Sequence, residues 1–178
     1  MQKILLLHGW GGSDYPHWQS WLAGEVAKAY GCICFPLLHN PHFPSKKRLM
    51  RQILEIMKSF APDTVICHSL ACTLWFHLCE AGEIPHVRRL LLVAPPANSC
   101  HIGTIRKFFP FPIPRDLHAK EATLITSTDD PYMSQEEAKA LQKSLGIGMM
   151  VLEDAGHIND KSGFGPWPWA LEWVHKGA

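Results

Sequence analysis

The chain has 178 residues, of which 47% are hydrophobic and 19% are charged, and its 17 Lys and Arg residues almost balance its 16 Asp and Glu residues. A composition of this kind is typical of a globular protein, and we expect one domain spanning residues 1–178. The formal net charge of +1 provides no field that would attract nucleic acid or an anionic membrane, so polyanionic partners are excluded.

The apolar run at residues 4–7 ends at a histidine and is shorter than the hydrophobic core of a secretion signal. No apolar stretch reaches the roughly 20 residues that a membrane-spanning helix needs. Without a secretion signal, the six cysteines are expected to be reduced thiols. We therefore expect a cytoplasmic protein that does not insert into a membrane.

Short apolar runs alternate with segments of helical period, which is typical of βαβ units and a parallel sheet. The predicted strands are residues 3–7, 32–35, 64–67, 89–93, 122–127 and 149–152. The predicted helices are residues 17–30, 46–60, 70–81, 135–145 and 168–175. This pattern predicts an α/β fold with one mostly parallel sheet of about six strands and helices on both faces.

Residues 98–121 contain the run F-F-P-F-P-I-P, which forms neither a regular helix nor an interior strand. A loop of this length in a compact domain is usually either disordered or functional, and its aromatic content argues against disorder. The segment is therefore predicted to be a long structured loop.

Residues 64–72, T-V-I-C-H-S-L-A-C, run from an apolar strand through Ser69 into a helical segment. This is the arrangement of a nucleophile elbow, in which a serine on a tight strand-to-helix turn projects its hydroxyl above the sheet. The positions two before and two after the serine must be small; here they are Cys67 and Ala71, where G-x-S-x-G has glycines. Taken alone, the segment also fits a serine near the N-terminus of a buried helix.

Asp130 and His157 follow Ser69 in the order of an α/β-hydrolase triad. Asp130 lies in S-T-D-D-P-Y-M after the strand at 122–127, and His157 lies in A-G-H-I-N after the strand at 149–152. Both positions fall at C-terminal strand ends, where ligands bind in open parallel sheets. The order and the setting predict Ser69 as nucleophile, His157 as general base and Asp130 as the acid that orients the base.

The sequence H-G-W-G-G at residues 8–12 directly follows the first strand. The backbone N–H groups of Trp10 and Leu70 are expected to form an oxyanion hole, worth about 3 kcal/mol per donor. A dinucleotide-binding loop is the alternative, but the glycine spacing does not fit G-x-G-x-x-G and no matching acid follows the second strand.

Five motifs together point to a known family of proteins. They are H-G-W-G-G at 8–12, the pair Trp18 and Trp21, H-S-L at 68–70, S-T-D-D-P at 127–131 and G-H at 156–157. With them the chain resembles, over nearly its whole length, the small α/β-hydrolases of the retinoblastoma-binding-protein-9 and YdeN type. The resemblance implies an α/β-hydrolase fold without a cap domain and a triad of Ser69, Asp130 and His157. It favours Asp130 over the adjacent Asp129, because the hydrolase run has an apolar residue three positions after the acid, here Met133.

The predicted function is that of a serine hydrolase, a carboxylesterase that acts on small or short-chain acyl esters through an acyl-enzyme. Thioesters and amides are alternative substrates for the same catalytic residues. Phe108, Phe109 and Phe111 of the long loop, with His68 and Ile158, are expected to line the substrate pocket; packing in the core under the loop is the alternative for each of the three rings. The expected partner is a small acyl substrate.

No cofactor and no metal are expected. The pairs Cys32-x-Cys34 and His39-x-x-His42 match no zinc pattern and are interpreted as strand and loop residues. Two other classes of function remain as alternatives. One is a catalytically weak protein of hydrolase fold that binds another protein, and the other is a nucleotide-binding module, which the missing phosphate-loop pattern disfavours.

Overall fold

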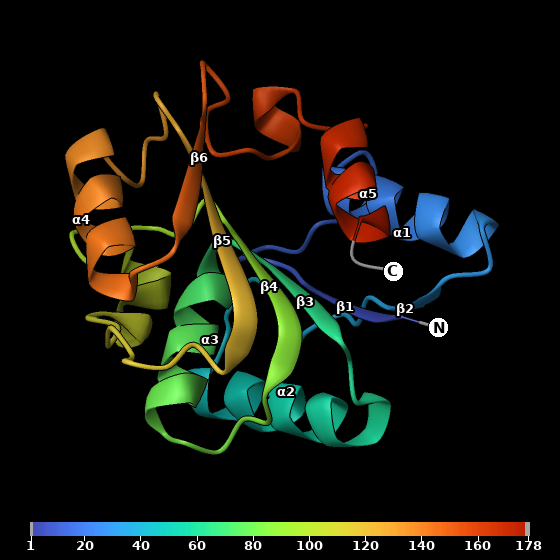
Figure 1. Cartoon of the computed structure of the whole chain (residues 1–178). Coiled ribbons are helices and arrows are strands. Elements are labelled where there is room, and N and C mark those ends of the chain that lie inside the picture. The colour runs from blue at the N-terminus through green and yellow to red at the C-terminus, as the bar shows by residue number, and fades with distance from the viewer. Residues whose placement is uncertain (1, 177–178) are drawn as a thin grey trace.

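A single parallel sheet organises the protein (Figure 1). In the computed structural model, which describes residues 2–176, the strand order is β2-β1-β3-β4-β5-β6 and every neighbouring pair is parallel. The strands are β1 (Lys3–Leu7), β2 (Cys32–Cys34), β3 (Thr64–His68), β4 (Val87–Val93), β5 (Ala119–Ser127) and β6 (Gly148–Leu152). The α/β class and the six predicted strands are confirmed.

Helices connect the strands at bounds close to those predicted from the sequence. They are α1 (Trp18–Lys28), α2 (Lys46–Phe60), α3 (Leu70–Glu80), α4 (Gln135–Leu145) and α5 (Pro168–His175), with the short 3-10 helices η1 (Gly103–Phe108) and η2 (Asp160–Ser162). The predicted starts of two strands, at 89 and 122, are wrong. β4 and β5 begin earlier, because backbone pairing starts at Val87 and Ala119, before the apolar part of each strand.

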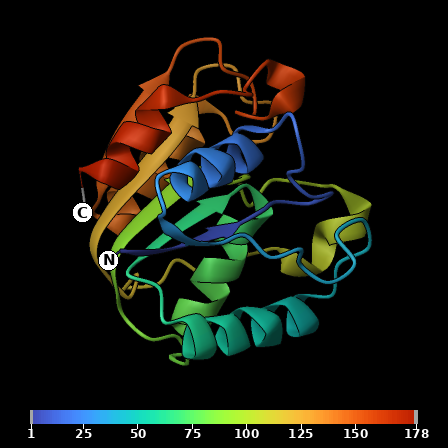
Figure 2. The ribbon, with the colours of Figure 1, turned by 90° about the vertical axis from the view of Figure 1, so that its right-hand side faces the viewer.

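The helices form a layer on each face of the sheet. Figure 2 shows α1 and α5 on one face, and α2 and α3 on the other. Successive strand side chains alternate between the two layers, as the pleat requires: Leu5 and Leu7 belong to the cluster around α3, and Ile4 and Leu6 to the cluster around α1 and α5. Because both faces are covered, the strands are apolar on both sides.

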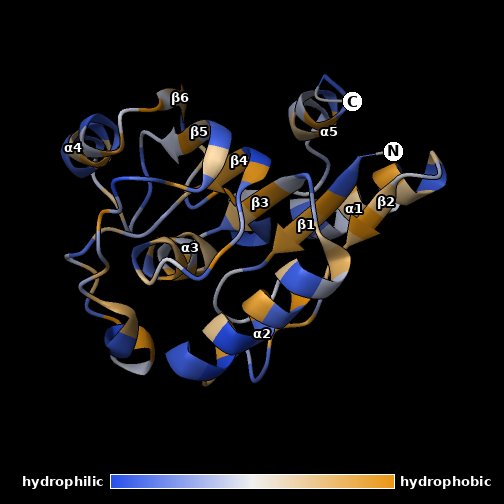
Figure 3. Ribbon diagram, turned by 60° about the horizontal axis from the view of Figure 1, so that its bottom comes forward, coloured by the Kyte–Doolittle hydropathy of each residue, from blue (hydrophilic) through white to orange (hydrophobic). Residues whose placement is uncertain are grey.

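Helices α2 and α4 show how local sequence sets the outer layer. Apolar and polar residues occupy different sides of α2 (Figure 3), and its buried residues Leu49, Ile53 and Met57 recur at spacings of four. At the start of α4, the Ser134 side chain accepts a hydrogen bond from the Glu137 N–H, and the Glu137 carboxylate accepts one from the Ser134 N–H. This capping box ends the loop that follows β5.

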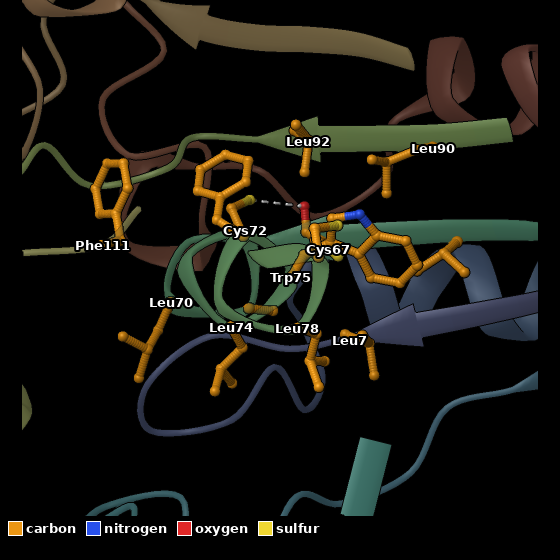
Figure 4. Close-up of a cluster of buried hydrophobic side chains, with 14 of the residues drawn as sticks. Leu7, Cys67, Leu70, Cys72, Leu74, Trp75, Leu78, Leu90, Leu92 and Phe111 are labelled. Carbon is orange, nitrogen blue, oxygen red and sulfur yellow. Dashed lines mark hydrogen bonds between the residues drawn. The ribbon is translucent and has the colours of Figure 1, made fainter. Parts of the chain in front are cut away.

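The loop between β4 and β5 packs its aromatic rings into the core. The side chains of Phe108 and Phe111 are buried in the same cluster as residues of α3. Figure 4 shows Phe111 in this cluster with Cys72 and Trp75 of α3. The Trp75 indole N–H donates to the Leu117 carbonyl at 2.9 Å. The rings therefore hold the loop on the helix, as structured loops require.

Across residues 2–176, none of the helices combines the length and the apolar character needed to cross a bilayer.

Candidate active site

Ser69 occupies a sharp turn between β3 and α3. Its backbone has φ 53° and ψ −119°, a conformation that is strained for a residue with a side chain. Two backbone hydrogen bonds hold the turn: the Ser69 N–H donates to the Val93 carbonyl and the Cys72 N–H donates to the Ser69 carbonyl, both at 2.9 Å. This is the geometry of a nucleophile elbow.

Cys67 and Ala71, two residues before and after the serine, are fully buried. Burial raises the pKa of the Cys67 thiol well above its usual value, and the Cys72 and Cys79 thiols nearby add to the effect. The Cys72 thiol donates to the Cys67 carbonyl at 3.5 Å (Figure 4). A buried, protonated thiol is neither accessible nor nucleophilic, so Cys67 contributes a small side chain to the turn.

Ser69, His157 and Asp130 come together in one chain of hydrogen bonds. The Ser69 Oγ lies 2.8 Å from His157 Nε2, and His157 Nδ1 lies 2.9 and 3.0 Å from the two carboxylate oxygens of Asp130. Because a carboxylate only accepts, Nδ1 carries the proton and Nε2 presents its lone pair to the serine. Asp130 and His157 are each 8% exposed, so this pair is largely shielded from water.

Ser127 and Asp129, just before Asp130, hold the loop that carries His157. The Ser127 Oγ accepts from the Ala155 N–H at 3.0 Å, and the Asp129 Oδ1 accepts from the Gly156 N–H at 2.7 Å. The Ser127 hydroxyl also donates to Asp129 Oδ1 at 2.7 Å. The hydrogen bond from the Ser127 hydroxyl, and after it the bond from the Gly156 N–H, hold the pKa of Asp129 below its usual value. Asp129 therefore contacts the loop backbone, whereas Asp130 contacts the imidazole.

The loop after β1 approaches the nucleophile closely. A Cβ atom on Gly9 would lie 2.9 Å from the Ser69 Cβ, so only glycine fits there. The Gly11 N–H donates to the Pro41 carbonyl at 3.0 Å, which fixes the turn that carries Trp10. Leu70 is the first residue of α3, so its N–H has no carbonyl within the helix to bind. The two predicted oxyanion donors thus belong to the loop after β1, whose Trp10 lines the same pocket as Ser69, and to the first residue of α3, which directly follows Ser69.

A pocket of about 390 Å³ opens above Ser69, within the size range of small-molecule sites. Its lining includes apolar residues, namely Pro96, Ile102, Ile105 and Tyr132, and polar residues, namely Asp14, His17, Asn159, Asp160 and Lys161. Of the residues predicted to bind substrate, His68 lines this pocket.

The other four predicted pocket residues lie elsewhere. Phe108 and Phe111 are buried in the core, Phe109 packs against the same cluster, and Ile158 is fully buried beside α1 and α5. The apolar lining instead comes from Pro96, Ile102 and Ile105 in the first half of the segment between β4 and β5, and from Tyr132, two residues after Asp130. These residues lie in the segments that follow β4 and β5, and this position is the signal by which the sequence could have identified them. The prediction instead relied on the phenylalanine-rich run.

Three buried histidines, His8, His17 and His68, lie in the same part of the molecule as the triad, and burial disfavours their charged form. Burial lowers the pKa of His8 and His68, and lowers the pKa of His17 to about 4. The His68 Nε2 faces the His157 carbonyl at 3.1 Å and must donate to it. The His17 Nδ1 caps α1 by accepting from the Gln19 N–H at 3.1 Å.

We expect acid to destabilise the fold through His17. Its pKa is about 4 when folded and about 6.5 in the unfolded chain, so the unfolded state binds protons more readily between these values. The contribution is complete above about pH 6.5 and is lost as the pH falls toward 4, by at most about 3 kcal/mol. Urea unfolding at pH 7 and pH 4.5 measures the change. His17→Asn keeps an N-cap acceptor that does not titrate, and an equal loss of stability in this variant would contradict the assignment.

One group with metal-ligating side chains is present among residues 2–176, formed by His86, Asp116 and His118. It lies outside the pocket, and the cysteine and histidine pairs at 32–34 and 39–42 do not belong to it.

Solved structures of low sequence identity share the fold. The product of the ydeN gene from Bacillus subtilis matches with a TM-score of 0.82 and 18% identity, over 99% of this chain and 98% of that one. A YdeN-like hydrolase from Pectobacterium atrosepticum matches with a TM-score of 0.76 and 21% identity, over 99% and 90%. The esterase domain of a Rhodothermus marinus protein matches with a TM-score of 0.68 and 13% identity, over 99% and 88%.

No curated protein matches this sequence. The profile of one protein family, described as serine hydrolase, covers residues 4–176 and so nearly the whole chain. The α/β-hydrolase fold agrees with this match. The chain therefore belongs to the serine hydrolase family.

Proposed function

We propose that this hydrolase cleaves small carboxylic esters through an acyl-enzyme on Ser69. The observation that carries the proposal is the hydrogen-bond chain from the Ser69 Oγ through His157 to Asp130, at 2.8 Å and 2.9 Å. It joins a nucleophile, a base with the correct tautomer and an orienting acid at the mouth of a pocket.

In the proposed reaction, His157 Nε2 takes the hydroxyl proton while the Ser69 Oγ attacks the ester carbonyl carbon. The resulting oxyanion accepts hydrogen bonds from the N–H groups of Trp10 and Leu70. Collapse of this intermediate expels the alcohol, which receives the proton from His157, and leaves the acyl group on Ser69. A water molecule then attacks the acyl carbonyl carbon while His157 Nε2 takes one of its protons. His157 passes this proton to the Ser69 Oγ as the acid leaves.

The pocket supports a substrate with an apolar end and a polar end. We therefore assign the acyl chain to Ile102, Ile105 and Tyr132 and the leaving group to Asn159 and Lys161, all of which line the pocket. The volume of about 390 Å³ suits a short or medium acyl chain. Thioesters present the same carbonyl to the same machinery and are the second candidate.

We also propose that the chain acts as a single domain and that it works in the cytoplasm. Its six cysteines are free thiols, which suits a reducing compartment.

A fluorophosphonate probe tests the proposal directly. The expected result is covalent labelling at Ser69, found by peptide mapping, together with turnover of p-nitrophenyl acetate or butyrate. The matched control is Ser13→Ala, which removes a buried serine from the loop after β1 and should leave labelling intact. A wild-type protein that neither reacts with the probe nor hydrolyses any ester or thioester would support the alternative, a binding protein of hydrolase fold.

A further inference from the structure

The group formed by His86, Asp116 and His118 lies at the end of the sheet opposite the pocket. The two histidines directly precede paired strands, because Val87 of β4 is opposite Ala119 of β5. The Val87 N–H donates to the His118 carbonyl at 2.8 Å, which extends the pairing to the histidines. In Figure 1 this place is at the lower ends of β4 and β5, whereas Asp130 and His157 follow the upper ends of β5 and β6. The strand register therefore brings the two histidines together, and their imidazole rings stack with centroids 4.6 Å apart.

Asp116 completes the group from the same loop as His118. Its Oδ1 accepts a hydrogen bond from the His118 N–H at 2.7 Å, and its Oδ2 lies 3.6 Å from His86 Nε2. Two ligand atoms held about 2.1 Å from a tetrahedral zinc ion lie about 3.4 Å apart, close to this separation. One ligand atom from each of the three residues lies within 4.8 Å of the other two.

His118 is oriented as metal-binding histidines are. Its Nδ1 lies 2.7 Å from the Ile84 carbonyl and must donate to it, so the lone pair is on Nε2. A second ring nitrogen bound to a carbonyl fixes the tautomer and the ring direction of a ligating histidine. The side chains of His86 and Asp116 are 67% and 58% exposed, so an ion from solvent reaches them.

We propose that His86, Asp116 and His118 bind a divalent transition-metal ion, with Zn²⁺ as the ion best suited to two imidazoles and one carboxylate. Water fills the fourth position. The ion ties the segment before β4 to the segment before β5, so it stabilises the fold and takes no part in hydrolysis. The proposal is independent of the proposed function, because the site shares no residue with the pocket.

Isothermal titration calorimetry of the full chain with ZnCl₂, together with thermal unfolding with and without Zn²⁺, tests the site. We expect one Zn²⁺ to bind the wild-type protein and to raise its Tm. His86→Ala and His118→Asn should each weaken binding by more than about tenfold and abolish the rise in Tm. Asparagine suits position 118 because φ is 50° there and its amide can still donate to Ile84.

His39→Ala removes an exposed histidine that is outside the group and should bind Zn²⁺ as the wild-type protein does. Ester hydrolysis by His86→Ala should equal that of the wild-type enzyme. The proposal is overturned if the wild-type protein binds no Zn²⁺ at millimolar concentration, or if His86→Ala and His118→Asn bind it as tightly as the wild-type protein and gain the same rise in Tm.

Discussion

Ser69→Ala is expected to abolish ester hydrolysis, lowering kcat by about 10⁴-fold or more, because it removes the hydroxyl that His157 Nε2 contacts. His157→Ala should cost about as much, since the two side chains act as one unit through their hydrogen bond of 2.8 Å. The double variant should be no worse than either single variant. Initial rates with p-nitrophenyl butyrate measure all three.

The fold of the Ser69→Ala variant should be unchanged, since alanine retains the Cβ and the backbone hydrogen bonds of the turn. Circular dichroism and urea unfolding verify this. A useful control is Ser99→Ala, which removes a hydroxyl that donates to Glu137 at 2.6 Å, outside the pocket. A folded Ser69→Ala enzyme with more than a tenth of the wild-type kcat would show that Ser69 is not the nucleophile.

Substitutions at the two adjacent acids are expected to differ strongly. Asp130→Asn should lower kcat by about 10³- to 10⁴-fold, because an amide at this position can donate to His157 Nδ1 and favours the tautomer whose Nε2 cannot accept the serine proton. Asp129→Asn should change kcat little, because its amide oxygen can still accept from the Gly156 N–H and the Ser127 hydroxyl. The comparison uses kcat and KM for the same ester.

Asp129→Ala separates the two roles further. It removes the acceptor for the Gly156 N–H and loosens the loop that carries His157, so we expect kcat to fall by about 10- to 100-fold with KM nearly unchanged. If Asp129→Asn has nearly the wild-type kcat, Asp129 acts by positioning the loop through its hydrogen bond to Gly156, and its negative charge is not required. If Asp129→Asn were more impaired than Asp130→Asn, the assignment of the triad acid would have to be reversed.

The sequence was sufficient where one physical signal dominates. Buried parallel strands are apolar on both faces, and the amphipathic period of α2 predicts its bounds, so the order of elements could be read directly. The positions of Ser69, Asp130 and His157 after strand ends could also be read, because parallel strands bring those ends to one edge. The structure places these three side chains within hydrogen-bonding distance of one another.

Other features depend on contacts between distant segments, which local patterns do not encode. An aromatic run such as that around Phe108 suits both a pocket wall and a core, and only its packing against α3 decides between them. The role of Asp129 depends on the Gly156 backbone, 27 residues later in the chain. His86 and His118 become neighbours only through the register of β4 and β5.

In the loop between β4 and β5, some residues attach the loop to the core and others line the pocket. Phe108 and Phe111 anchor it to α3, whereas Cys100 and Ile102, which are only half-buried, form part of the pocket wall. Substitutions at positions 100 and 102 can therefore change the shape of the pocket while the anchoring rings stay in place. A directed-evolution library confined to these two codons would therefore vary the pocket lining while Phe108 and Phe111 keep the loop attached to α3.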